Sequence, residues 1–277
     1  MASLLALLSA ALWGSSDFEG GRISKKYPAI SVLGSTQLIS LIFGGVLVFV
    51  VGETHLTAKI FLSGAAAGIC GYLGLVCLYA GLSTGKMGVV SAISSLSTII
   101  PVSIAIFTGE KPHAIVLLGM VIAIVGGFMS SGPEIKGGVG AKPILYGIVA
   151  AILFGAGVYF MTHGSKSNVL LTMTTMRIPA VIMALSIALF TRSLGGMDRK
   201  IIKVIAVVGI GDFTANILLG LASTKGLISV AVVLAGLYPV ITALWAYVHS
   251  HERLHKIQYF GIVATITGAS IISITAG

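Results

Sequence analysis

Charge is scarce in this chain of 277 residues, of which only 9% are Asp, Glu, Lys or Arg. Soluble domains carry roughly 25% charged residues, so the composition excludes a soluble globular protein. Hydrophobic residues make up 56% of the chain, and its mean hydropathy is +1.07. We therefore expect a membrane protein, whose formal charge of +9 meets lipid head groups rather than nucleic acid.

Long polar segments and catalytic motifs are also lacking. The longest polar connector, 192–203, has about a dozen residues, which leaves no room for a soluble domain. No phosphate-binding loop, nucleotide motif or nucleophile triad occurs, so we expect no enzyme, no ATP-driven pump and no cofactor. The only two cysteines, Cys70 and Cys77, lie seven residues apart on one apolar segment, which favours packing over a disulfide or a metal site.

Apolar segments of membrane-spanning length fill the chain. A spanning helix needs about 20 apolar residues, and alternating ten-residue segments typical of a β-barrel do not occur. We predict an all-α integral membrane protein with ten transmembrane helices. The predicted spans are approximately 2–18, 28–51, 60–83, 87–108, 114–131, 144–161, 169–190, 201–223, 227–248 and 257–276.

The second half of the chain repeats features of the first. Ala11–Gly14 resembles Ile152–Gly155, and a glutamate followed by two glycines recurs 142 residues later: Glu110, Gly119 and Gly126 match Glu252, Gly261 and Gly268. We predict five-helix repeats over 1–132 and 143–277, joined by 133–142. An odd number of crossings makes the repeats inverted, as in many secondary transporters. The alternative is that the duplication only enlarges a helical bundle.

Short motifs follow one another along nearly the whole chain, at 14–21, 87–90, 109–110, 211–216, 237–239 and 251–253. In order and spacing they resemble the paired EamA domains of the drug/metabolite transporter superfamily. The resemblance implies a ten-helix fold with inverted repeats and a role in moving small metabolites, with export as the favoured direction.

The segment His251–His255 reads HERLH and matches the H-E-x-x-H pattern of zinc proteases. Catalytic zinc needs a third protein ligand; His249 cannot share a helical face with His251, and the other histidines are expected at the opposite membrane end. The repeat preserves only the glutamate, so an intramembrane zinc protease is disfavoured and no metal site is predicted. Glu110 and Glu252 instead suit the starts of spans five and ten, where a carboxylate favours the helix dipole.

Lys and Arg are distributed unequally between the two ends of the spans. The connectors that follow odd-numbered spans carry twelve of them, and the opposite connectors carry four. The positive-inside rule places the twelve in the cytoplasm and both termini outside. The family resemblance places both termini inside, so the two predictions conflict. Both agree on a multi-pass plasma-membrane protein with its termini on one side.

Ionisable residues deep in a membrane are costly and are therefore functional candidates. Arg177 lies eight residues into span seven and Asp212 eleven residues into span eight. Those spans run in opposite directions, so the depths of about 12 and about 16 Å from opposite faces nearly coincide. We predict that the two side chains face each other or share a wet cavity. A static ion pair, an anion-binding Arg177 and a proton-carrying Asp212 all remain open.

Polar neighbours extend this candidate site. Asn216 lies four residues after Asp212 and shares its helical face. Gln37 corresponds to Arg177 at an offset of 140, so the symmetric site is polar on both sides but charged on one. That asymmetry suits a substrate with a single acidic or polar end.

Aromatic residues and one further acid complete the candidates. Trp13, Tyr159 and Tyr238 are predicted to line the cavity, with helix packing as the alternative. Asp17 lies four residues after Trp13 and near the end of span one. It is a candidate for proton coupling, alongside Asp212, or a simple interfacial or capping residue.

These features predict a secondary transporter of a small metabolite or amphipathic compound, an exporter that works by alternating access through a central cavity. A passive channel and a flippase for a lipid-linked substrate are the alternatives. The expected partners are a small-molecule substrate and membrane lipids. Gly64 and Gly68 form a small-residue face that suits packing within a monomer or a homodimer.

Overall fold

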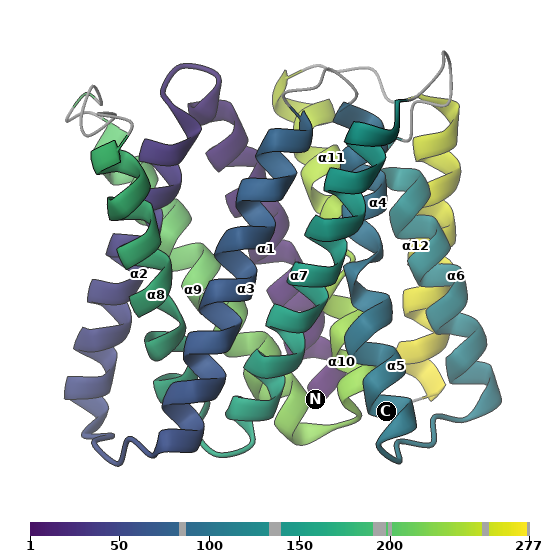
Figure 1. Ribbon diagram of the computed structural model, residues 1–277. Coiled ribbons are helices and arrows are strands. Elements are labelled where there is room, and N and C mark those ends of the chain that lie inside the picture. The colour runs from purple at the N-terminus through teal and green to yellow at the C-terminus, as the bar shows by residue number, and fades with distance from the viewer. Residues whose placement is uncertain (83–86, 133–139, 191–197, 199–200, 251–254, 276–277) are drawn as a thin grey trace.

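The structure is a computed structural model that describes residues 1–82, 87–132, 140–190, 198, 201–250 and 255–275, and every regular element in these ranges is a helix. The helices stand side by side as upright rods (Figure 1). The first helix begins, and the last helix ends, at the same end of the molecule (Figure 1). They are α1 (Ala2–Ser24), α2 (Ala29–Val51), α3 (Ala58–Leu82), α4 (Met87–Ser95), the 3-10 turn η1 (Leu96–Thr98), α5 (Ile99–Phe107), α6 (Ala114–Ser130), α7 (Ala141–Ser165), α8 (Val169–Phe190), α9 (Ile202–Lys225), α10 (Ile228–Ala235), α11 (Tyr238–Ser250) and α12 (Lys256–Thr275).

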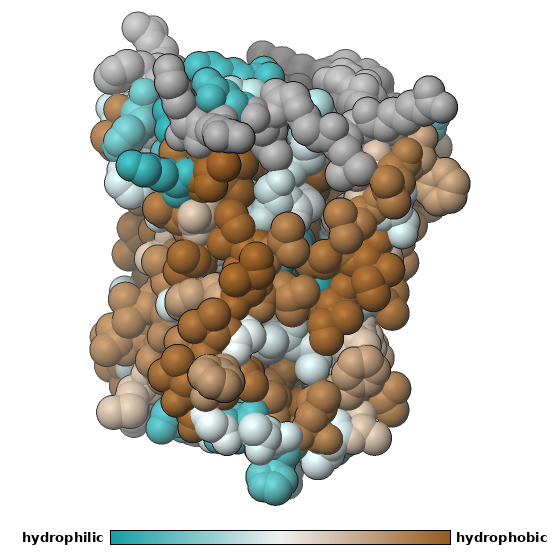
Figure 2. All heavy atoms as spheres, turned by 90° about the vertical axis from the view of Figure 1, so that its left-hand side faces the viewer, coloured by the Kyte–Doolittle hydropathy of each residue, from teal (hydrophilic) through white to brown (hydrophobic). Residues whose placement is uncertain are grey.

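These helices make ten crossings, because α4, η1 and α5 form one rod and α10 and α11 form another. Eight crossings in the described ranges are long and apolar enough to span a membrane, and α6 is a shorter apolar helix of 17 residues. The tenth, α1, carries Asp17, Glu19 and Arg22. On the face of α2 and α8, a hydrophobic band separates hydrophilic ends (Figure 2). The predicted all-α membrane fold is confirmed.

The last helices of the two halves, α6 and α12, pack closely and antiparallel. A Cβ atom on Gly119 would lie 3.1 Å from the carbonyl oxygen of Gly268, and one on Gly126 would lie 2.8 Å from that of Gly261. A contact that lies further along α6 therefore lies nearer the start of α12. Each of these glycine pairs maps onto the other at the offset of 142 seen in the sequence. The two halves are thus inverted, as predicted.

The same reciprocity holds at the centre of the molecule. A Cβ on Gly14 of α1 would lie 2.6 Å from the carbonyl oxygen of Tyr238, and a Cβ on Gly155 of α7 would lie 2.6 Å from that of Ser97. Gly155 lies 141 residues after Gly14, and Tyr238 lies 141 residues after Ser97. The two helix pairs are therefore copies of one contact, and larger residues at these glycines would force the helices apart.

The small-residue face of α3 packs against α8 within the chain. A Cβ on Gly64 would overlap the Thr175 hydroxyl, and one on Gly68 would overlap the carbonyl oxygen of Met176. These glycines serve the intramolecular packing that the sequence allowed as one alternative.

Three details of the expected spans are corrected by the structure. Helix α1 continues to Ser24 rather than ending near Phe18, because nothing in 19–24 breaks a helix apart from two tolerated glycines. Asp17 is therefore well inside the helix and not an end cap. Spans four and nine, each predicted as a single segment (87–108 and 227–248), are interrupted at Leu96–Thr98 and at Gly236.

Glu110 does not mark the start of α6, as expected, but binds the start of α10. Its Oε1 accepts a hydrogen bond from the backbone N–H of Ile228 at 2.6 Å, and its Oε2 accepts from the N–H and hydroxyl of Ser229 at 3.0 and 2.7 Å. Glu110 does bind the positive end of a helix dipole, as predicted, but the helix is α10 of the second repeat and not α6. Glu252 lies outside the described residues, as do positions 251–254 of the HERLH segment.

Candidate functional site

A cavity of about 610 Å³ lies between the two halves. Side chains from both repeats line it, including Trp13, Asp17, Gln37, Tyr72, Ser97, Thr98, Phe154, Arg177, Asp212, Asn216 and Tyr238. Pockets of this size accommodate a small organic molecule.

The cavity reaches only one end of the molecule. Its lining includes Gly21, Ser131 and Gln258, which lie near the end of α1, just after α6 and near the start of α12. In the other direction it stops at Met161, Leu219 and other residues of the largest apolar core cluster. That cluster continues through the start of α1 and through α10, whose residues from Ser229 to Ala235 are all buried. The end that carries the termini is closed.

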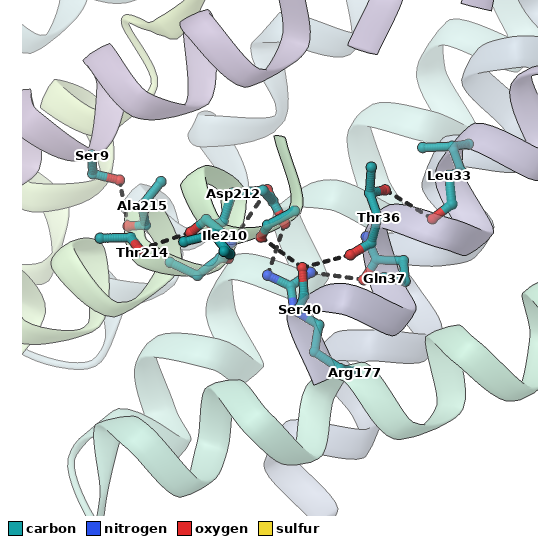
Figure 3. Close-up of polar contacts among 12 residues, drawn as sticks. Ser9, Leu33, Thr36, Gln37, Ser40, Arg177, Ile210, Asp212, Thr214 and Ala215 are labelled. Carbon is teal, nitrogen blue, oxygen red and sulfur yellow. Dashed lines mark hydrogen bonds and ion pairs between the residues drawn. The ribbon is translucent and has the colours of Figure 1, made fainter. Parts of the chain in front are cut away.

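An ion pair between a buried arginine and a partly exposed aspartate crosses one wall of the cavity. Arg177 of α8 is 4% exposed, and its Nη2 lies 2.8 Å from Oδ2 of Asp212 on α9. Its Nη1 donates a hydrogen bond of 2.8 Å to Oε1 of Gln37 on α2, and its guanidinium carbon lies 5.8 Å from the ring centre of Phe213. Figure 3 shows the arginine reaching both partners. The predicted proximity of Arg177 and Asp212 is confirmed, and Gln37 shares the site.

Asn216 supports this pair from the same helix. Its Nδ2 donates to the backbone oxygen of Asp212 at 2.6 Å and lies 3.4 Å from Oδ1 of that carboxylate. Nearby, the Ser40 hydroxyl donates to the backbone oxygen of Gly209 at 2.7 Å and ties α2 to α9 (Figure 3). Helices α2, α8 and α9 are therefore joined by polar contacts at the depth of the cavity.

An aromatic corner and a carboxylate without an ion-pair partner among the described residues also face the cavity. The rings of Trp13 and Tyr238 meet edge to face, with centroids 6.1 Å apart and planes at 76°. Asp17 lies one helical turn beyond Trp13, lines the cavity and is exposed within it. Among the described residues, no hydrogen bond or ion pair to the Asp17 carboxylate is found.

Tyr159 is not among the described residues that line the cavity. Its ring packs at 5.3 Å from that of Phe160 and at 5.9 Å from that of His163. Phe154, five residues earlier, lines the cavity instead. The internal repeat could have identified Phe154, because this residue has the position in the second repeat that Trp13 has in the first.

The two helix interruptions also border the cavity. Ser97 and Thr98 line it from the break between α4 and α5, and Gly236 and Tyr238 line it from the break between α10 and α11. Prolines follow each break, within the first turn of the next helix, where proline is best tolerated. Interrupted helices at mid-depth expose backbone groups that can bind a solute.

Comparison with known proteins agrees with this geometry. The sequence matches the EamA-like transporter family over residues 1–132 and again over 141–274. The chain belongs to this family. EamA-like proteins are membrane transporters and not enzymes, so the chain is a multi-pass membrane transporter.

Two individual relatives extend the comparison. The uncharacterized protein MJ1333.1 of Methanocaldococcus jannaschii is 28% identical over 132 residues, which are 48% of this chain and 96% of that protein. Its length therefore corresponds to about one repeat of the EamA-like chain. A solved structure described as a crystal structure of a protein shares the fold, with a TM-score of 0.79, 16% identity and coverage of 99% of this chain and 97% of that one.

We expect the Arg177 and Asp212 pair to stabilise this EamA-like transporter only as a pair. Arg177→Gln leaves a carboxylate without its cation, and removing one partner of a buried pair costs about 3–5 kcal/mol. Asp212→Asn leaves the arginine unpaired with a similar loss. The double variant R177Q/D212N leaves no lone charge and should recover much of the stability. Thermal unfolding of the detergent-solubilised proteins measures each change.

A matched control is Glu19→Gln, which breaks the surface pair between Glu19 and Arg22, at 2.6 Å. Exposed pairs contribute about 0–1 kcal/mol, so its melting temperature should hardly change. Losses in the double variant equal to the sum of the single losses would show that Arg177 and Asp212 do not stabilise each other.

Proposed function

We propose that the chain is a secondary transporter that moves a small solute by alternating access through its central cavity. The observation that carries this proposal is a cavity between inverted halves that, among the described residues, reaches one end of the molecule and is closed by apolar packing at the other. Two inverted repeats can exchange conformations, and the exchange moves the opening to the opposite end.

The unequal packing of equivalent helices supports this exchange. Helix α10 is buried from Ser229 to Ala235 and closes one end. Its counterpart α4 buries only alternate residues from Val90 to Ser94, with Ser91 and Ile93 partly exposed. In the opposite state, α4 would take the buried position and α10 the looser one.

The alternatives are less consistent with these features. A passive channel needs a polar path from end to end, whereas Met161, Leu219 and Val232 close this cavity with apolar side chains. A flippase for a lipid-linked substrate shares the alternating mechanism and would need the cavity to open sideways toward lipid. The transporter of a small metabolite or amphipathic compound remains the leading proposal.

Export is the proposed direction. The cavity opens at the end of α1 that is followed by Lys25 and Lys26, and this charge-rich end is cytoplasmic by the positive-inside rule. A cavity open to the cytoplasm is ready to load a cytoplasmic solute. In cells, a cysteine placed at Lys26 should resist a membrane-impermeant thiol reagent, and one placed at Lys59 should react, in a background without Cys70 and Cys77. Labelling of the cysteine at position 26 would show that this end faces outward, opposite to the proposed orientation.

Filling the cavity should block transport without unfolding the protein. A Cβ on Gly71 meets no atom within 4 Å, and this glycine lines the cavity. We expect Gly71→Phe to fold and to lose most transport. The assay uses proteoliposomes loaded with a defined mixture of cationic, anionic and neutral metabolites, and mass spectrometry measures which are released.

The matched control is Gly45→Phe. Gly45 also has no atom within 4 Å of a Cβ, but it lies on the exposed outer face of α2. This variant should transport as well as the unaltered protein. A contrary result is that vesicles with Gly71→Phe, Gly45→Phe or the unaltered protein all release the solutes equally, and faster than protein-free (empty) vesicles. That result would place the transport path elsewhere. Release no greater than from empty vesicles would argue against transport.

Proton exchange at Asp17 is the proposed coupling. Asp212 is held by Arg177 at 2.8 Å, whereas Asp17 faces the cavity without an ion pair among the described residues. An imposed pH gradient should accelerate solute movement against the proton flow. Asp17→Asn should abolish that acceleration. Persistence of the acceleration in Asp17→Asn, with its loss in Asp212→Asn, would assign the proton to Asp212.

A further inference from the structure

We infer that the cavity selects organic cations with an apolar or aromatic body, and that the Asp17 carboxylate binds their charged group. This inference rests on the proposed transport function and adds the chemical class of the substrate. Three features carry it: an arginine that is already paired with Asp212, a carboxylate without an ion-pair partner among the described residues, and aromatic side chains that line the cavity.

Arg177 has little positive charge to offer a solute. Its guanidinium is paired with Asp212 at 2.8 Å and hydrogen-bonded to Gln37 at 2.8 Å. The residue is only 4% exposed, and one side of the group faces the ring of Phe213. An anionic solute would have to displace Asp212 from this pair. The geometry therefore assigns Arg177 to holding α8, α9 and α2 together.

Asp17 sets the net charge of the cavity. The acidic and basic side chains that line it in the described part of the chain are Asp17, Asp212 and Arg177. Asp212 and Arg177 neutralise each other, which leaves the charge of Asp17. A carboxylate in membrane surroundings is costly unless it is paired. A cationic solute would provide the partner that the protein does not.

Aromatic rings stand beside this carboxylate. Trp13 is on the same face of α1 because it lies four residues before Asp17, and its ring touches that of Tyr238 edge to face at 6.1 Å. Phe154 and Tyr72 also line the cavity. Aromatic faces attract cations, with Trp the strongest. A ring system next to a carboxylate suits an ammonium group on a hydrophobic body.

An inorganic cation fits the site less well. Calcium takes six to eight oxygen ligands, and no group of three or more His, Cys, Asp or Glu in the described ranges is placed to hold a metal ion. The cavity of about 610 Å³ is also far larger than an ion needs. An organic cation uses both its charge and its volume.

The test compares three probes of similar size on the detergent-solubilised full-length protein: benzyltrimethylammonium, 3-phenylpropanamide and 3-phenylpropionate. Titration calorimetry measures each affinity. We expect the cation to bind at least about tenfold more tightly than the neutral amide and the anion. Asp17→Asn should weaken binding of the cation at least about tenfold and leave the amide unchanged. Tighter binding of the anion, or unaltered cation binding in Asp17→Asn, would overturn the inference.

Two further variants guard against indirect effects. Glu19→Gln makes the same charge change two residues away, at a residue that pairs with Arg22 and is not among the described cavity-lining residues, so it should bind the cation normally. Trp13→Leu should weaken cation binding several-fold, and Trp13→Phe should restore most of it. Loss of binding in Glu19→Gln, or no difference between the two Trp13 variants, would contradict the site even if Asp17→Asn fails to fold.

The vesicle experiment separates the substrate class from the transport function. Movement of anionic or neutral metabolites that Gly71→Phe blocks, without movement of cations, would overturn the cation assignment and leave the transporter standing. Cation binding that depends on Asp17, without movement of any solute across the membrane, would leave the site standing and overturn transport. Asp17-dependent movement of cations alone supports both.

Discussion

One buried ion pair fixes the character of the central cavity. By joining Arg177 to Asp212 at 2.8 Å, with Gln37 on the other side of the guanidinium, the protein links three helices across its two repeats. Such a pair needs close partners because a lone charge in this environment is expensive. The same pairing neutralises both charges, which leaves neither of them to attract a solute. This contact supports the helices, and under the proposed selectivity it also leaves Asp17 as the carboxylate that selects for charge.

Inverted symmetry governs the helices but not the chemistry of the site. The contacts of Gly14 and Gly155 are copies of each other at an offset of 141. At an offset of 140 the first repeat has Gln37 in place of Arg177, and at an offset of 141 it has Gly71 in place of Asp212. Equivalent backbones thus present different side chains to the cavity. In the proposed mechanism, symmetry would supply two interchangeable states, and asymmetry a binding site that differs on its two sides.

Periodic and additive features were predictable from the sequence. The number of crossings follows from apolar length, and the meeting of Arg177 with Asp212 follows from helical rise and opposite directions. Contacts that depend on helices far apart in the sequence were not accessible. Glu110 binds Ser229 across 119 residues, and nothing local distinguishes that role from a cap on its own helix. The direction of Asp17 and of Tyr159 depends on helix length and rotation, which packing decides.

The contact between Glu110 and α10 links the two repeats at the closed end. One carboxylate accepts two backbone N–H groups and one hydroxyl of α10, so all three bonds are kept or lost together. A partial displacement of α10 would strand polar groups of both repeats, at a cost of about 1–3 kcal/mol for each buried group. Intermediate positions of this helix are thereby disfavoured. Under the proposed alternating access, this seal would act as a latch with two settings, so that the two ends of the protein are not open at once.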